Sequence, residues 1–369
     1  MDPMNHRRLK IFVAEGPFNI GRMVSEVLLD LGMDAWTESQ GTFSKADVII
    51  MPTSPEAGLG LTTDWQVPLK SGVVIVLWLV DPFPPPDLSA TEEAIANRIA
   101  ELNWRFMLPK RWANIAIKWA PFGREIMRMR RWVCIKKLRK EITRSGKLDY
   151  LDCTNREWTR IMVRNHKLSQ CMQRGHINYL FATTKAKQQF LAQRGYDIDF
   201  IPFGYHRIFG EDLGLERDID VLFLGRLNTK RRVSLLRNLR GELQAKGVKL
   251  RIVKGECYGD ERTELLNRTK ISLDIPRVPW DFGPERFLMS ISCGALVVSE
   301  GIKPREPYTH GENFIQAQVS DLADTIHRYL RDEQQRQRIT TNAYEYITTQ
   351  LNLRKSVSRM LEKCNLNAL

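Results

Sequence analysis

The sequence has no pair of cysteines spaced as Cys-x-x-Cys, and its six cysteines and six histidines form no cluster with zinc-site spacing. This absence excludes the common structural zinc sites, whose ligands come in such pairs. The scattered cysteines also lack the dense framework that stabilises small secreted domains. We therefore expect free or buried thiols in a reducing compartment, and no bound metal.

Long apolar runs are also missing. The most apolar stretch, residues 73–80, has eight residues, whereas a membrane-spanning helix needs about 20. The first sixteen residues contain neither a long apolar core nor a small-residue cleavage site, so they differ from a secretory signal. We expect a cytoplasmic protein that is either soluble or peripheral at the inner membrane face.

Acidic residues are scarce in one segment in particular. Residues 110–147 contain thirteen Lys and Arg against two Glu, a net charge of +11 out of +13 for the whole chain. Trp112, Trp119, Phe122 and Trp132 are interleaved with these cations. A basic helix with aromatic residues suits an anionic membrane surface or a nucleic-acid backbone. The alternative interpretation is a solvated helical face. The membrane surface is the first partner we expect, and nucleic acid the second.

The chain does contain two successive series of short apolar runs that alternate with helix-period segments. Such a pattern is typical of parallel sheets covered on both faces, so we predict an α/β fold with two Rossmann-like domains. A chain of 369 residues is long enough for two cores. The first predicted domain spans residues 1–210, with a basic, Trp-rich helical insert at about 105–150. The second spans 211–369, and its last helix is predicted to pack back on the first domain.

The expected strands share a short, apolar and mostly β-branched composition. In the first domain they lie at 9–13, 34–37, 47–51, 73–80, 179–183 and 200–202. In the second domain they lie at 220–224, 249–253, 271–275 and 295–299. A polar linker is expected near 206–217, and the first helix of the second domain is expected at 233–245.

The second domain opens with a strand that leads through Gly225 into the cationic turn FLGRLNTKRR. Glycine lets the backbone approach a phosphate, and the N–H groups of the following helix point at the anion. Arg226, Lys230 and Arg231 would add positive charge. The pattern predicts a turn that binds a diphosphate.

A second segment, DFGPERFLMSISCGALVVSE, covers residues 281–300. Gly283 precedes a helix that opens with Pro284 and Glu285, both favoured in a first turn. A diphosphate at this helix N-terminus would be within reach of Arg286 in the same turn.

Residues 267–300, together with IPFGYHRIFG and YLRDEQQRQRI, resemble glycosyltransferases of the GT-B fold, and the spore-maturation-type branch most closely. The resemblance covers residues 175–345. It implies two Rossmann-like domains that face a central cleft, with a nucleotide-sugar donor held by the second domain and an acceptor by the first. It also implies chemistry without a metal or cofactor, since the nucleotide-sugar is a substrate.

Many of these relatives carry two acidic residues eight positions apart around the donor-site helix. Asp281 matches the first, which lies near the donor sugar, and it is predicted to be catalytic. The second, which holds the ribose, falls on Met289, whose thioether cannot accept hydrogen bonds as a carboxylate does. Either Glu285 or Glu300 substitutes for it, or the donor site is altered.

Two features of the first domain are also candidates. Gly16, Asn19 and Gly21 lie in the turn after the first strand, where the backbone can approach a donor phosphate or an acceptor. Asp81 follows a long apolar strand, and ligands of open α/β sheets bind at the carboxyl ends of strands. We therefore predict Asp81 as the second catalytic residue, a general base.

The sequence thus predicts a glycosyltransferase that moves a hexosyl group from a UDP- or GDP-sugar to an acceptor hydroxyl, with a membrane-associated glycan as the candidate acceptor. Two alternatives stay open: a DNA-modifying glycosyltransferase, and a non-catalytic nucleic-acid-binding or scaffold protein on the same frame. Met289 favours the scaffold. Stabilisation by UDP or GDP would distinguish the scaffold from an enzyme.

Overall fold

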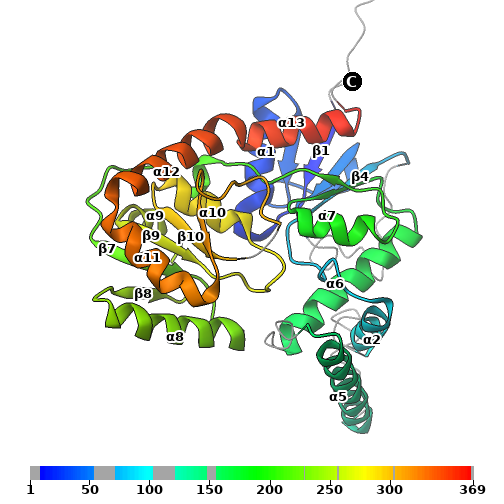
Figure 1. The fold of residues 1–369 in the computed structure, drawn as a ribbon. Helices are drawn as coiled ribbons and strands as arrows, with labels where there is room; N and C mark the ends of the chain where they lie inside the picture. Colours follow the sequence, from blue (N-terminus) through cyan, green and yellow to red (C-terminus); the bar gives the residue numbers. More distant parts are fainter. Residues whose placement is uncertain are drawn as a thin grey trace, which may run out of the picture. The chain divides into compact units, whose positions relative to one another are not determined.

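The computed structural model describes residues 9–53, 71–102, 121–147, 155–227, 229–255, 257–301 and 304–366. The chain divides into two compact units (Figure 1). The first unit comprises Met1–Ala182, Lys187–Asp199 and Cys364–Leu369, and the second comprises Thr183–Ala186 and Phe200–Lys363.

The first unit is built on a six-stranded sheet with the order β2-β1-β3-β4-β5-β6. Its strands are β1 (Lys10–Val13), β2 (Asp34–Thr37), β3 (Val48–Met51), β4 (Val74–Leu79), β5 (Tyr179–Ala182) and β6 (Asp199–Phe200). The pairings among β1 to β5 are all parallel. All of β3 and nearly all of β4 are buried, because both strands consist of apolar residues that pack on both faces.

The helices of the first unit are α1 (Ile20–Asp30), α2 (Ala90–Glu101), α5 (Pro121–Arg144), α6 (Asn155–Gln173) and α7 (Lys185–Ala192). The sequence did not predict α2, which begins with a capping box. Ser89 N donates to Glu92 Oε2 (2.7 Å), and Glu92 N donates to Ser89 Oγ (3.2 Å). Lys147, just beyond α5, pairs with the same Glu92 carboxylate at 3.0 Å, which ties α5 to the start of α2.

The second unit contains a five-stranded sheet with the order β11-β10-β9-β7-β8, and its pairings are parallel. The strands are β7 (Ile219–Leu224), β8 (Leu250–Val253), β9 (Thr269–Asp274), β10 (Leu296–Glu300) and β11 (Ile315–Ala317). Four of them match predicted strands closely. The sequence did not predict β11, an edge strand of three residues.

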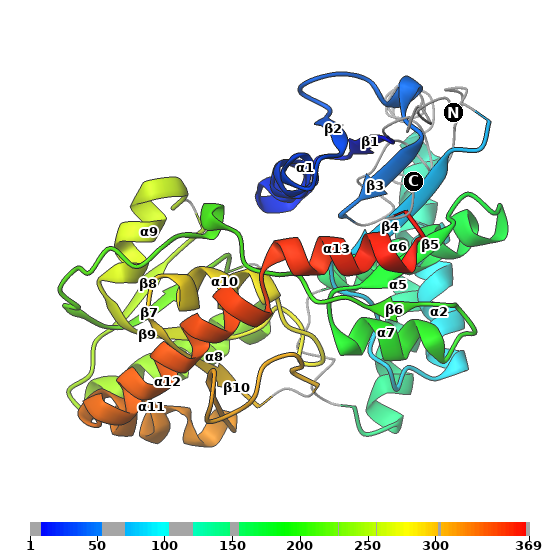
Figure 2. The ribbon, with the colours of Figure 1, turned by 90° about the horizontal axis from the view of Figure 1, so that it is seen from above.

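Helices cover both faces of this second sheet (Figures 1 and 2). The helices of the second unit are α8 (Lys230–Ala245), α9 (Gly259–Asn267), α10 (Pro284–Ser292), α11 (Leu322–Arg331), α12 (Glu333–Glu345) and α13 (Leu353–Lys363). On one face α8 and α11 lie together, and α9 and α10 lie on the other. A single core cluster joins β7, β9 and β10 to α8, α11 and α12.

The main segment of the second unit begins at Phe200, ahead of the predicted boundary at residue 211. Backbone hydrogen bonds give the reason: Tyr205 N donates to Leu351 O (2.7 Å), and Leu353 N donates to Tyr205 O (2.8 Å). Ser356 Oγ donates to Pro202 O at 2.8 Å. The segment after β6 is thereby bound to the start of α13.

None of the described helices is both long and apolar enough to cross a membrane.

Candidate functional site

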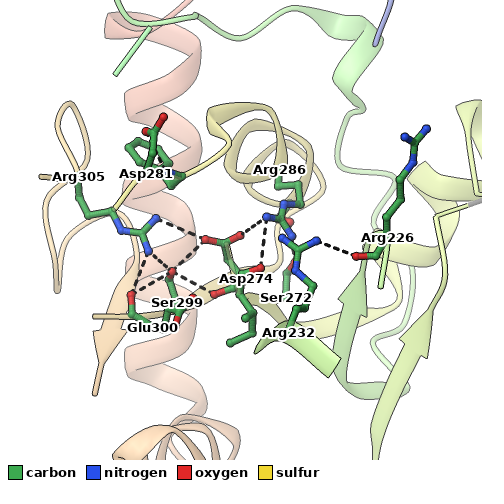
Figure 3. A network of polar contacts seen from close by, with 12 residues as sticks. Arg226, Arg232, Ser272, Asp274, Asp281, Arg286, Ser299, Glu300 and Arg305 are labelled. Carbon is green, nitrogen blue, oxygen red and sulfur yellow. Dashed lines mark hydrogen bonds and ion pairs between the residues drawn. The ribbon is translucent and has the colours of Figure 1, made fainter. Parts of the chain in front are cut away.

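The candidate site lies at the carboxyl edge of the second sheet. Because β7, β9 and β10 are parallel, their last residues, Leu224, Asp274 and Glu300, lie at the same edge. Helices α8 and α10 begin beyond this edge with Lys230 and Pro284. The charged side chains that gather here form the network in Figure 3.

Asp274 is the centre of this network. Its Oδ1 lies 3.2 Å from Arg286 Nη2, and its Oδ2 lies 3.4 Å from Arg305 Nη1. Ser299 Oγ donates to the same Oδ2 at 3.0 Å. Asp274 and Arg305 are both buried, and the Arg305 guanidinium stands 4.9 Å from the Phe282 ring. The carboxylate therefore pairs with two arginines, of which Arg305 is buried and Arg286 is partly exposed.

Glu300 forms a second buried pair with Arg231. Arg231 Nη1 donates to Glu300 Oε1 at 2.9 Å, and Arg231 Nη2 contacts Oε2. Burial raises the pKa of Glu300, while the Arg231 guanidinium acts in the opposite direction. Arg231 and Glu300, which were both predicted to bind the nucleotide-sugar, thus form an ion pair with each other.

Arg232 is a buried arginine without an ion-pair partner among the described residues. Its residue is 3% exposed, and no acidic side chain in the described ranges forms an ion pair with it. Arg232 Nη1 donates to Arg226 O at 2.8 Å, but its Nε has no partner among the described residues. Burial, together with Arg286 and Arg277 nearby, lowers the pKa of Arg232 well below its usual value, although Asp274 and Glu300 act in the opposite direction.

Arg286 also has a hydrogen-bond donor that is not used. Its Nη1 has no hydrogen-bond partner within the described part of the chain. A Cβ placed on Gly225 would lie 3.4 Å from this Nη1, so the donor faces the glycine turn. Four arginines, at residues 231, 232, 286 and 305, thus lie around two carboxylates, those of Asp274 and Glu300. The edge therefore has an excess of positive charge and unfilled donors, which suits a polyanion.

The structure does not bring together the Arg226 and Arg286 guanidinium groups. Figure 3 shows the Arg226 side chain directed away from the network, while Arg286 points into it. The Arg226 side chain is exposed, and its Cγ would lie 3.1 Å from a Cβ on Gly255. Lys230, another predicted phosphate ligand, is also exposed.

Sequence reasoning missed Arg232 because it expected helix α8 to begin at residue 233. The helix begins at Lys230, where Thr229 is the N-cap and accepts a hydrogen bond from Arg232 N at 3.2 Å. Successive helical residues point about 100° apart, so Arg231 reaches Glu300 while Arg232 enters the interior. The Thr-Lys-Arg-Arg pattern, with a cap residue before three cations, was the available signal.

Helix α10 begins as predicted. Gly283 is its N-cap, Pro284 is its first residue, and Glu285 is in its first turn and buried. Asp281 is 2% exposed, and its Oδ1 accepts a hydrogen bond from Phe282 N at 2.9 Å. Met289 is buried in the same helix. The roles predicted for Asp281, Glu285 and Glu300 toward a donor stay predictions.

In the first unit, the glycines of the β1–α1 turn have a packing role. A Cβ on Gly16 would lie 2.5 Å from Pro52 O, and one on Gly21 would lie 2.4 Å from Ala14 O. Phe18 and Asn19 both adopt left-handed backbone angles, with φ of 58° and 59°. The turn is tightly built, and its predicted contact with a phosphate or acceptor stays a prediction.

Asp81 lies just beyond β4 and forms an ion pair in the first unit. Arg164 Nη2 lies 3.4 Å from Asp81 Oδ1, and Arg164 Nη1 donates to Pro82 O at 3.4 Å. A carboxylate held by a buried arginine is less available as a general base. Its predicted catalytic role is not tested by this geometry.

Among the described residues, no group of three or more His, Cys, Asp or Glu side chains is placed to hold a metal ion. The five described cysteines are all free thiols.

A family model described as glycosyl transferase-like matches residues 224–362, the segment that carries the site. Residues 224–362 are a glycosyl transferase-like domain. The match confirms the predicted glycosyltransferase resemblance over residues 224–362, and the two parallel sheets confirm the predicted α/β fold. The closer resemblance to the spore-maturation-type branch and the cleft between the domains stay predictions.

Several solved structures are also similar to this chain. HepE from Anabaena, in complex with UDP-glucose, is 10% identical with a TM-score of 0.46, over 97% of this chain and 100% of that one. Sucrose-phosphate synthase from Thermosynechococcus elongatus is 12% identical with a TM-score of 0.47, over 98% and 100%.

TarM from S. aureus is 15% identical with a TM-score of 0.44, over 52% of this chain. The match covers 45% of TarM, so this chain spans less than half the length of that protein. No curated protein matches the sequence.

Proposed function

We propose that the second unit of this glycosyltransferase binds the diphosphate of a nucleotide-sugar, and that the enzyme transfers a hexosyl group from a UDP- or GDP-sugar to an acceptor hydroxyl. The observation that carries the proposal is the unneutralised Arg232 beside Arg286 and the Gly225 turn. A buried guanidinium without a carboxylate costs several kcal/mol, and an anionic ligand would offset that cost.

The chemical step requires stabilisation of the departing nucleoside diphosphate. Arg286 offers an unpaired Nη1 in the first turn of α10, where backbone N–H groups also favour an anion. Arg226 is exposed, so its side chain is able to rotate toward a bound ligand. Donors fixed before the reaction stabilise charge that develops on the leaving group at little reorganisation cost.

The test is a comparison of Arg286→Ala with wild type, in both nucleotide binding and sugar transfer. We expect UDP or GDP to stabilise the wild type by about 2.7 kcal/mol at a hundred times its Kd. The variant should lose most of this stabilisation, and its turnover should fall by about 100-fold or more. Arg226→Ala should have a smaller effect, because its side chain lies outside the network.

Arg237→Ala is the matched control, since this exposed arginine lies on α8 two turns from the site. Full nucleotide stabilisation in Arg286→Ala would contradict the proposal. If no nucleoside diphosphate stabilised the wild type, the non-catalytic scaffold would be the better interpretation.

For the acceptor, we propose a glycan held at an anionic membrane, because the basic helix α5 favours that location. A DNA acceptor is the alternative that the same helix leaves open.

A further inference from the structure

Helix α5 carries a concentration of exposed apolar side chains. Among the described residues, eleven large hydrophobic side chains are exposed, and four of them lie in a single eight-residue stretch of α5. They are Ile126, Met129, Trp132 and Val133, with 48%, 60%, 55% and 44% of their surface exposed. Their burial in a partner would remove apolar surface from water at about 25 cal/mol per Å².

These side chains lie on the face of α5 that its own unit leaves uncovered. Leu138 and Ile142 are buried, and α5 packs against α2 (Figure 1). At 100° per residue, Met129 points roughly opposite to Leu138. The helix thus has a packed side toward α2 and an open side with apolar residues.

Cations surround this open side. The exposed basic residues of α5 are Arg128, Arg130, Lys136, Lys137, Arg139, Lys140 and Arg144. Only two acidic residues, Glu125 and Glu141, lie on the helix, and they pair with Arg128 (3.6 Å) and Arg144 (3.0 Å). Lys136 Nζ lies 3.8 Å from the centre of the Trp132 ring. An ammonium group thus lies directly beside the largest exposed apolar side chain.

We propose that the open face of α5 binds the surface of an anionic lipid bilayer. Lipid phosphates match the excess of Lys and Arg, each of which contributes about 1 kcal/mol near such a surface. The interfacial layer takes up Trp and aliphatic side chains, which a nucleic-acid backbone would leave in water. The apolar side chains therefore favour a bilayer over a nucleic acid as the partner. The helix lies on the bilayer and does not span it.

Vesicle co-sedimentation of the full chain tests this surface. We expect binding to vesicles in which roughly a quarter of the lipid is phosphatidylglycerol, and little binding to phosphatidylcholine alone. Added salt should weaken the binding, since the charges are exposed. Met129→Glu and Trp132→Glu should each weaken it by about tenfold, because each replaces an inserted apolar group with a charge.

The control is Leu213→Glu, which places the same charge on an exposed apolar position of the second unit. It should leave vesicle binding unchanged, and melting curves should show that all three variants stay folded. Equal binding to both kinds of vesicle, or unchanged binding by both α5 variants, would overturn the proposal. So would tighter binding to duplex DNA that needs Lys136 and Lys140 but not Met129. Vesicle binding needs neither donor nor turnover, so a failure here leaves the nucleotide-sugar proposal untouched.

Discussion

The two units of this protein are both built on parallel sheets. They differ in whether the buried arginine at the carboxyl edge of the sheet has an acidic partner. In the first unit, buried Arg164 faces Asp81, so the cation is neutralised. In the second unit, buried Arg232 has no acidic partner among the described residues, and Arg286 retains an unused donor. The same kind of sheet can therefore have a buried arginine neutralised by a carboxylate in one unit, and a buried arginine available to an external anion in the other.

Removal of the central carboxylate should give the largest effect on stability. Asp274→Asn leaves buried Arg305 and partly exposed Arg286 without their shared carboxylate, and breaking a buried pair costs about 3–5 kcal/mol. Asp81→Asn should cost less, because the Asp81 side chain is 23% exposed. Thermal unfolding of both variants measures the difference, with Asp218→Asn as a surface control on a pair with Arg268. Equal losses of stability in Asp81→Asn and Asp274→Asn would show that the ion pairs of Asp274 stabilise the protein no more than the pair of Asp81.

Substitution of the two buried arginines, Arg164 and Arg232, should affect stability differently. Arg164→Met leaves Asp81 unpaired and should lower the melting temperature. Arg232→Met removes an uncompensated charge, so the melting temperature without ligand should stay the same or rise by the equivalent of about 1 kcal/mol. Only Arg232→Met should lose stabilisation by UDP or GDP. A marked loss of stability in Arg232→Met without ligand would mean that this arginine is structural, not a ligand for an anion.

Two buried glutamates should give opposite pH dependences. Burial raises the pKa of Glu92, but hydrogen bonds from Ser89 and Lys147 together outweigh it, so the pKa lies below 4.5. Its stabilisation is therefore present above pH 4.5 and is lost as the pH falls through the folded-state pKa. Burial dominates for Glu300 and raises its pKa above 4.5, so its contribution is present in acid and is lost as the pH rises through the folded-state pKa.

Melting temperatures of wild type, Glu92→Gln and Glu300→Gln across the acidic range would test these signs. Glu92→Gln should flatten the loss on acidification, and Glu300→Gln should flatten the loss as the pH rises. The same pH response in both variants would contradict the predicted opposite pH dependences of Glu92 and Glu300.

Much of the fold was predictable from the sequence, because strands and helices leave a local periodic signal. The prediction for α10 matched Pro284–Ser292, and the strand predicted at 34–37 is β2. Two elements were missed: β11 has three residues, and the apolar residues of α2 are only Ala and Ile.

By itself the sequence determined two parallel-sheet units, a glycosyl transferase-like second half and a cationic turn at residue 225. Only the tertiary structure decided which cations enter the site. Arg231 and Arg232 are neighbours in the chain, but the helical first turn of α8 directs one to Glu300 and the other into the interior. The partner of Arg305 lies 31 positions away, at Asp274. Periodicity is a local property, whereas the pairing of distant charges depends on the path of the whole chain.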